Sequence, residues 1–82
     1  MEYRIGQVVR SIAGRDNGKA FIVVKTEGDY VYIADGKTHR LESPKKKKLK
    51  HIQGSYNVSE EIAAGIESKT AENYMLRRFL NS

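Results

Sequence analysis

Residues 6–24 read Gly-Gln-Val-Val-Arg-Ser-Ile-Ala-Gly-Arg-Asp-Asn-Gly-Lys-Ala-Phe-Ile-Val-Val, two apolar runs on either side of a short loop of glycines and charged side chains. Runs of β-branched residues that flank such a loop are typical of two antiparallel strands. We therefore predict strands over residues 7–12 and 20–26. Residues 21–24 are all apolar, which indicates that the second strand is buried on both faces. Another part of the chain must then cover its second face.

A third strand is predicted over residues 30–34, where alternation places Val31 and Ile33 on one face and Tyr30 and Tyr32 on the other. Because the second strand calls for a cover, we expect the two tyrosines to pack beneath a C-terminal helix. The alternative is that they face outward and stack on unpaired bases, which would make Tyr32 an RNA contact.

The next strands are defined by turn residues and by one charged run. Asp35-Gly36 favours a type I′ hairpin turn that leads into a fourth strand over residues 37–41. Residues 42–48 contain the only proline and four successive lysines, and we interpret them as an exposed connection. Alternation over residues 49–53 predicts a short fifth strand.

Helix-forming residues follow the strands. Asn57 or Ser59 is expected to cap a first helix, and Thr70 to cap a second helix over residues 71–80. The apolar side chains of the second helix share one stripe at helical spacing: Tyr74, Leu76, Phe79 and Leu80. We expect this stripe to cover the second face of residues 20–26.

Five short strands followed by helices predict a mainly β protein, a small antiparallel barrel that helix closes or caps. A chain of 82 residues has room for one small domain. It contains no cysteine, which excludes disulfides and thiolate metal sites. Neither an apolar run of about 18 residues nor a signal-peptide pattern occurs, so we predict a cytoplasmic protein with no membrane partner.

The polar residues give no catalytic pattern. His39 and His51 are separated by the lysine run, and no pair of carboxylates stands at a recognisable spacing from a base. Two histidines without a spaced carboxylate are also poor metal ligands. We therefore expect no enzyme activity, no cofactor, no metal and no small-molecule substrate.

The net charge of +5 is concentrated in the first part of the chain. Residues 1–50 contain 12 Lys and Arg against 6 Asp and Glu, whereas residues 51–82 contain 3 against 4. A basic sheet beside a nearly neutral tail favours an anionic partner for the sheet, most commonly nucleic acid. The alternative is that the charge only keeps the protein soluble.

Residues 6–19 resemble a KOW motif, an element of ribosomal proteins and transcription elongation factors, in the order of a glycine, paired valines, a basic stretch, Gly-Arg-Asp and Gly-Lys. Among KOW proteins the chain is most similar to small stand-alone bacterial RNA-binding proteins related to large-subunit ribosomal proteins of archaea and eukaryotes. Ala34-Asp35-Gly36-Lys37 and the lysine-rich residues 45–51 also fit that branch. The resemblance covers residues 3–53.

The resemblance implies an SH3-like five-stranded antiparallel barrel, which we assign to residues 1–53. The helix-forming residues that follow predict a helical C-terminal extension over residues 54–82 that packs on the barrel. The resemblance also implies a non-enzymatic, ribosome-associated or translation-related protein that binds structured RNA through the loop after the first strand. Ribosomal RNA is the expected partner, within a ribonucleoprotein.

The loop divides into residues that shape it and residues that contact RNA. Arg15 suits bidentate phosphate contacts and Lys19 a point-charge contact. Asp16 is expected to brace the loop, by accepting a nearby backbone N–H or by pairing with Arg15 or Lys19. The residues expected to shape the loop are Gly6, Gly14, Asp16 and Gly18. A hairpin loop with solvated charges is the alternative.

The other candidate RNA contacts are basic side chains near the loop in sequence. The lysine run would add phosphate contacts that do not depend on sequence and that weaken with salt, although such runs are more often solvated linkers. The full set of candidate RNA contacts is Arg10, Arg15, Lys19, Tyr32, Lys37, His39, Arg40, Lys45, Lys46, Lys47, Lys48 and Lys50.

A second functional hypothesis is a protein–protein interaction module in transcription or ribosome assembly. Its partners would be proteins of the ribosome or of the transcription machinery, bound by the C-terminal apolar stripe or by a sheet edge. A stripe left exposed by the fold would favour this hypothesis.

Overall fold

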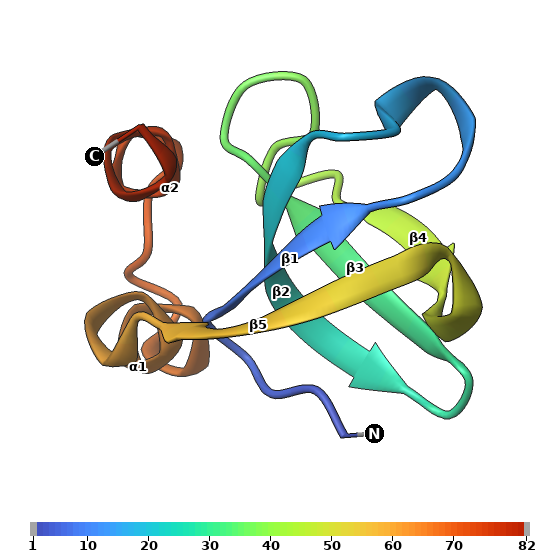
Figure 1. Cartoon of the computed structure of the whole chain (residues 1–82). Helices are drawn as coiled ribbons and strands as arrows, with labels where there is room; N and C mark the ends of the chain where they lie inside the picture. Colours follow the sequence, from blue (N-terminus) through green and yellow to red (C-terminus); the bar gives the residue numbers. More distant parts are fainter. Residues whose placement is uncertain (1, 82) are drawn as a thin grey trace.

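Five strands precede two helices in the computed structural model, which describes residues 2–81 (Figure 1). The outer ends of the two predicted units, Met1 and Ser82, lie outside the described residues. The strands, 3-10 helices and α-helices are β1 (Gln7–Ser11), η1 (Gly14–Asp16), β2 (Ala20–Glu27), β3 (Tyr30–Ala34), β4 (Lys45–Lys48), η2 (Leu49–His51), β5 (Ile52–Val58), α1 (Glu60–Ser68) and α2 (Asn73–Leu80).

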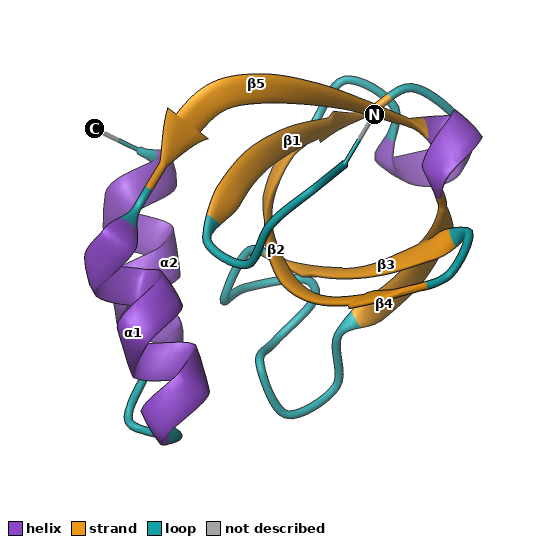
Figure 2. Cartoon of the chain, turned by 90° about the horizontal axis from the view of Figure 1, so that it is seen from below, coloured by secondary structure: helices purple, strands orange, loops and turns teal. Residues whose placement is uncertain are grey.

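The strands form one antiparallel sheet in the order β4-β3-β2-β1-β5. The predicted mainly β fold with a five-stranded antiparallel sheet is therefore confirmed. Figure 2 shows that the sheet is strongly curved and that α1 and α2 lie together on one side of it. Strands β4 and β5 are the two edges of the sheet in this order.

The lysine run forms β4, so the prediction of an exposed connection over residues 42–48 is wrong for its second half. This strand pairs with β3, with Lys45 opposite Ile33 and Lys48 opposite Tyr30. Lysine is common on edge strands because its charge discourages pairing with another chain. Hydrogen bonds to β3 thus override the low β propensity of lysine.

The predicted fourth strand over residues 37–41 is wrong, because a side chain closes the turn before it. Asp35 Oδ1 accepts hydrogen bonds from the backbone N–H groups of Lys37 and His39, both at 2.9 Å. The N–H groups of Asp35 and Gly36 in turn donate to the His39 carbonyl, at 2.8 and 3.1 Å. A local turn replaces the type I′ hairpin, and the chain continues as a loop to β4.

The predicted fifth strand over residues 49–53 is displaced along the chain. Leu49–His51 form η2, and the strand itself runs over Ile52–Val58. It pairs with β1, where Ser11 is opposite Ile52. The lead-in to the strand is therefore helical, and the strand is longer than alternation indicated.

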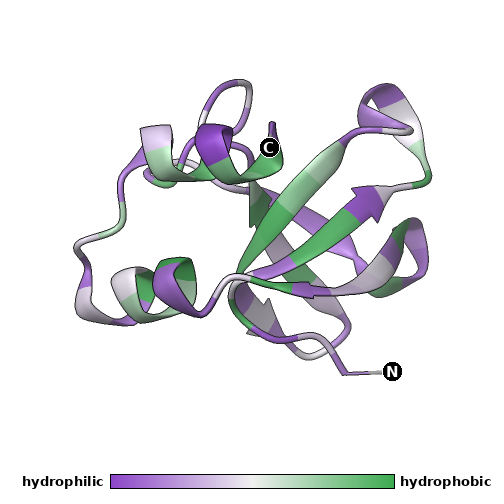
Figure 3. Cartoon of the chain, turned by 60° about the vertical axis from the view of Figure 1, so that its left-hand side comes forward, coloured by the Kyte–Doolittle hydropathy of each residue, from purple (hydrophilic) through white to green (hydrophobic). Residues whose placement is uncertain are grey.

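Apolar side chains cover both faces of β2. Phe21 and Val23 belong to an inner cluster within the curved sheet, whereas Ile22 belongs to an outer cluster with the helices. The inner cluster consists of Val9, Phe21, Val23, Val31, Ile33 and Ile52. The outer cluster consists of Ile22, Ala34, Ile62 and Leu76, with Phe79 and Leu80 partly buried against it. Leu76, Phe79 and Leu80 of the predicted stripe thus cover the second face of β2, whereas Tyr74 is 49% exposed and lies outside the cluster. Hydrophobic stretches on both helices and the strands are visible in Figure 3.

Helix α1 begins after Ser59, whose side chain accepts one of the backbone N–H groups that have no partner within the helix. Ser59 Oγ accepts a hydrogen bond from the backbone N–H of Ile62 at 3.1 Å, so Ser59 rather than Asn57 is the cap. Glu60 and Glu61 lie in the first turn, where the helix dipole favours negative charge.

Helix α2 begins later than predicted, at Asn73 with Glu72 before it, so a start at residue 71 with Thr70 as cap is wrong. The backbone N–H groups of Thr70 and Ala71 donate to the Gly65 carbonyl, at 2.8 and 3.0 Å. Both residues therefore close the end of α1, and Thr70 Oγ1 lies 2.8 Å from Ser68 Oγ instead of capping α2.

Candidate nucleic-acid interface

The loop between β1 and β2 is held by its own backbone. Gly18 N–H donates to the Ser11 carbonyl at 2.8 Å, and Lys19 N–H donates to the Asp16 carbonyl at 2.9 Å. Gly14 and Gly18 have φ of +75° and +88°, the left-handed region that favours glycine. These two residues therefore set the path of the loop. Gly6 lies outside it, against the start of α1.

Three predicted RNA contacts are exposed on or beside this loop: Arg10, Arg15 and Lys19. Arg10 extends from β1 and its Nη1 donates to the Gly18 carbonyl, which leaves its other donors for a ligand. Arg15 lies in η1 at the turn of the loop. The loop and the adjoining end of β1 therefore present three basic side chains to solvent at one end of the sheet.

Asp16 is buried, and its carboxylate meets a residue from a distant loop. Its Oδ2 lies 3.1 Å from Nε2 of His39, whose ring also packs against Phe21 with centroids 5.6 Å apart. The partner of Asp16 is therefore His39, and neither a neighbouring amide nor Arg15 or Lys19 as the sequence suggested. His39 is half-buried in this contact, so it fixes the loop in place.

Lys47 connects β4 to the loop after β1. Its Nζ donates to the Ala13 carbonyl at 3.2 Å, and its register opposite Val31 places it on the inner face of the sheet. The ammonium group also lies 3.5 Å from the point that a Cβ on Gly14 would occupy. Lys47 thus connects β4 to the loop after β1 at a basic edge of the sheet, whereas Lys46 and Lys48 stand opposite Tyr32 and Tyr30 on the other face.

The outer face of β3 is covered by the helices at one end and lies beside lysines at the other. Ala34 lies under the helices, whereas Tyr32 and Tyr30 lie beside lysines of the neighbouring strands. Lys46 Nζ is 4.4 Å from the ring centroid of Tyr30, and Lys25 Nζ is 5.2 Å from that of Tyr32. The expectation that these tyrosines pack beneath a helix is therefore wrong.

We call this second surface the tyrosine–lysine face and define it as Lys25, Glu27, Tyr30, Tyr32, Lys46 and Lys48. Its one acid, Glu27, lies 3.8 Å from Lys25 Nζ and 3.6 Å from Lys46 Nζ. Exposed ion pairs of this kind contribute little, so an incoming phosphate can compete for either lysine. The face thus has two aromatic rings beside lysines that can exchange Glu27 for a phosphate.

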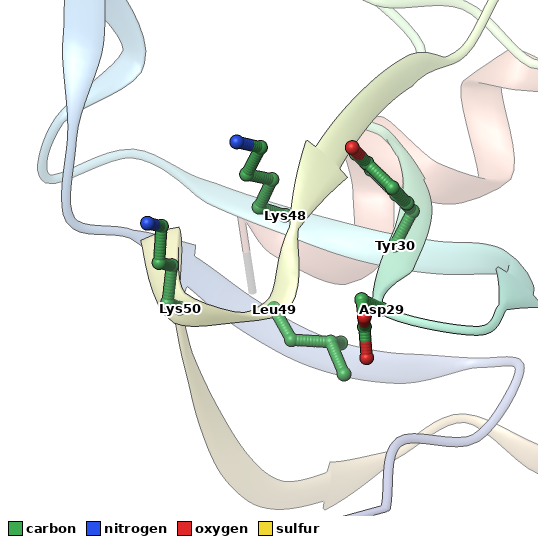
Figure 4. A pocket seen from close by; sticks show the side chains of 5 residues that line it. All are labelled: Asp29, Tyr30, Lys48, Leu49 and Lys50. Atoms are coloured by element: carbon green, nitrogen blue, oxygen red, sulfur yellow. The ribbon is translucent and has the colours of Figure 1, made fainter.

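A cavity of about 400 Å³ continues the tyrosine–lysine face around the end of β4 (Figure 4). It is lined by Asp29, Tyr30, Lys48, Leu49 and Lys50. In Figure 4 the side chains of Tyr30, Lys48 and Lys50 extend to the same side, and those of Asp29 and Leu49 to the other. A ring beside two ammonium groups suits a nucleotide, because the base can stack while the phosphate pairs with the lysines.

Asn73 at the start of α2 fastens the loop before β4 to the helix. Its Oδ1 accepts the backbone N–H of Leu41, and its Nδ2 donates to Glu42 Oε1, both at 2.8 Å. The hydrogen bond from Asn73 lowers the pKa of Glu42, with a smaller contribution from Arg40. Arg40 lies 4.0 Å from Glu42 and lines the groove beside α2, so the fold places it next to the helix.

Two basic residues near these surfaces, Lys25 and Arg77, are not among the RNA contacts predicted from the sequence. Lys25 reaches the outer face because the β2–β3 register shifts between Val23 and Lys25, which puts it opposite Tyr32. Arg77 lies on α2 and lines a cavity with Lys19 and Lys37. Only the tertiary fold brings that helix to the loops, so no local pattern could have found Arg77.

Within residues 2–81 no group of three or more His, Asp or Glu side chains is placed to hold a metal ion. In the same part of the chain, no helix has both the length and the apolar character needed to cross a membrane. Comparison with models of known families and with curated proteins gives no match for this chain.

Proposed function

We propose that the chain is a non-enzymatic RNA-binding protein of the KOW type, an SH3-like barrel with a helical extension, that acts in the cytoplasm on structured RNA. The observation that carries the proposal is the hydrogen bond from Lys47 Nζ to the Ala13 carbonyl. Through it the loop with Arg15 and Lys19 is connected to β4 at one basic edge of the sheet. Ribosomal RNA is the partner class we propose, within a ribonucleoprotein.

The two basic surfaces divide the work of binding. Exposed basic side chains of the loop and of β4 contact phosphates, which positions the RNA without reading its sequence. On the tyrosine–lysine face, Tyr30 and Tyr32 stack on unpaired bases, and the neighbouring lysines exchange Glu27 for phosphate. His39 and Asp16 hold the loop in its binding conformation.

A salt titration of RNA binding tests this proposal. The purified full chain is titrated into a fluorescently labelled ribosomal RNA fragment with a single-stranded loop, at several salt concentrations. We expect log K to fall with log salt by about 0.7 to 0.9 per phosphate contact. Arg15→Gln and Lys46→Gln should each reduce this slope by about one contact, whereas Lys69→Gln, at the end of α1, should leave it unchanged. Salt-independent affinity would overturn the electrostatic mechanism.

The protein-interaction hypothesis required an apolar stripe left exposed by the fold. Ile62 and Leu76 are buried, and Ile66, Phe79 and Leu80 are partly buried against the same outer cluster. The stripe is therefore used by the fold itself and offers no support for a partner at that surface.

A further inference from the structure

A cavity of about 240 Å³ lies where the start of β2, the turn after β3 and the second half of α2 meet. Three basic side chains from these three segments line it: Lys19, Lys37 and Arg77. The other lining residues are Ala20, Asp35, Leu80 and Asn81. Segments far apart in the sequence thus bring three positive charges to one concave site.

Three positive side chains line this cavity against a single acid, Asp35. Among the described residues, none of Lys19, Lys37 and Arg77 forms an ion pair with a carboxylate within 4.0 Å. The one acid in the lining, Asp35, already accepts two backbone N–H groups through Oδ1. The cavity therefore has an excess of donors and positive charge over acceptors.

Arg77 is held in position by the turn that faces it. Its Nη1 donates to the Gly36 carbonyl at 2.6 Å, which leaves the remaining guanidinium N–H donors for a ligand. Gly36 packs so closely on the helix that an added Cβ would lie 2.2 Å from the Asn73 carbonyl oxygen. The guanidinium is thus presented by a fixed contact and does not swing freely in solvent.

We propose that this cavity binds a phosphate of the RNA backbone, which makes α2 part of the RNA-binding surface and not only a cover for β2. The inference rests on the proposed function. A guanidinium with two flanking ammonium groups matches the charge and the acceptor oxygens of a phosphate. Lys19 also belongs to the loop that carries Arg15, so the cavity continues the basic edge onto the helix.

Neighbouring arginines of α2 give a matched pair of variants. Arg77→Gln removes the charge inside the cavity, whereas Arg78→Gln removes the same charge from the adjacent position, which lines a different cavity with Glu61 and Phe79. Both variants are made in the full chain, and thermal unfolding checks that each is folded. Lys37→Gln is a second cavity variant, on the exposed turn, in case Arg77→Gln is unstable.

We expect Arg77→Gln and Lys37→Gln each to weaken binding of the labelled RNA about 5- to 10-fold and to lower the salt slope by about one contact. Arg78→Gln should change affinity less than twofold. Equal losses for Arg77→Gln and Arg78→Gln, or no loss for either cavity variant, would overturn the proposal. If the cavity variants bind normally while Arg15→Gln is impaired, the result supports RNA binding by the chain and overturns the phosphate site in this cavity.

Titration with inorganic phosphate separates an RNA phosphate from a free anion. Amide shifts of residues 19, 36 and 37 are followed by NMR during addition of RNA and, separately, of phosphate. We expect saturation by RNA at micromolar concentration and only weak shifts with phosphate. Saturation by phosphate that RNA does not displace would assign the cavity to a free anion and overturn the proposal, and a wild-type chain that binds no RNA would overturn both the site and the proposed function.

Discussion

Nε2 of His39 lies 3.1 Å from Oδ2 of Asp16, which joins the loop after β1 to the loop before β4. The imidazole is 20% exposed and the carboxylate 11%, so water has little access to the contact. On its other side the imidazole packs against Phe21 of the inner cluster. The loop that carries Arg15 and Lys19 is therefore fixed to the core through this pair.

Removal of either partner should destabilise the fold and reveal the coupling between them. We expect Asp16→Ala and His39→Ala each to lower the free energy of unfolding by about 1 to 3 kcal/mol, because a largely buried polar group loses its hydrogen bond. The double variant should cost at least about 0.5 kcal/mol less than the sum. Urea denaturation of the four proteins measures this cycle. His39→Gln, which keeps a nitrogen donor, should recover part of the loss, and additive costs would contradict the pairing.

Gly36 should tolerate alanine far less well than another glycine with positive φ. Its φ is +77°, and an added Cβ would lie 2.2 Å from the carbonyl oxygen of Asn73, which is backbone and cannot move aside cheaply. Gly28 has φ of +58°, but nothing lies within 4 Å of its added Cβ. Gly28→Ala should therefore cost about 1 to 2 kcal/mol from backbone strain alone, and Gly36→Ala clearly more. Thermal and urea unfolding give the comparison, and equal costs would show that the turn does not press on α2.

The parts of the fold that could be predicted from sequence are those decided by local pattern and burial. β1, β2 and β3 are rich in β-branched residues, and the four apolar positions of residues 21–24 correctly required a cover on each face. The stripe of α2 supplies part of that cover on the outer face, because Leu76 is buried in one cluster with Ile22 of β2. In these segments local preference and tertiary packing agree.

Other elements depend on partners that a single stretch of sequence does not contain. The lysine run becomes β4 because the edge of β3 supplies hydrogen bonds, and residues 37–41 fail to form a strand because the Asp35 carboxylate binds two of their amides. The candidate site shows the same limit. The loop sequence predicts a bracing role for Asp16, but its partner His39 is 23 residues away and is brought to it only by the fold.

The hydrogen bond from Asn73 to Glu42 makes stability depend on pH in the acid range. Because this bond lowers the pKa of Glu42 in the folded chain, the carboxylate stabilises the fold at pH values above its ordinary pKa. That contribution is lost as pH falls through the lower, folded value. In NMR titrations Asn73→Ala should therefore raise the Glu42 pKa towards its ordinary value. The stability difference between wild type and Glu42→Gln should shrink as the solution is acidified, and a pKa unchanged by Asn73→Ala would show that the bond is not formed in solution.

Tyr32 provides a test of the tyrosine–lysine face that is separate from the phosphate contacts. Its ring lies 5.2 Å from Lys25 Nζ, and its hydroxyl lies 3.3 Å from Glu27 Oε1. If the ring stacks on an unpaired base, Tyr32→Ala should weaken binding of a single-stranded RNA by about 1 to 3 kcal/mol. Tyr32→Phe should bind like wild type, because it keeps the ring and loses only the contact with Glu27.

Tyr56 on β5 is the matched control, because it is a fully exposed tyrosine on the opposite edge strand. Tyr56→Ala should leave RNA affinity unchanged in the same fluorescence titration. A loss in Tyr32→Phe as large as in Tyr32→Ala would assign the effect to the hydroxyl and against stacking. Loss of affinity without a change in salt slope would then identify the ring, and not the neighbouring lysines, as the group removed, since the slope reports only on phosphate contacts.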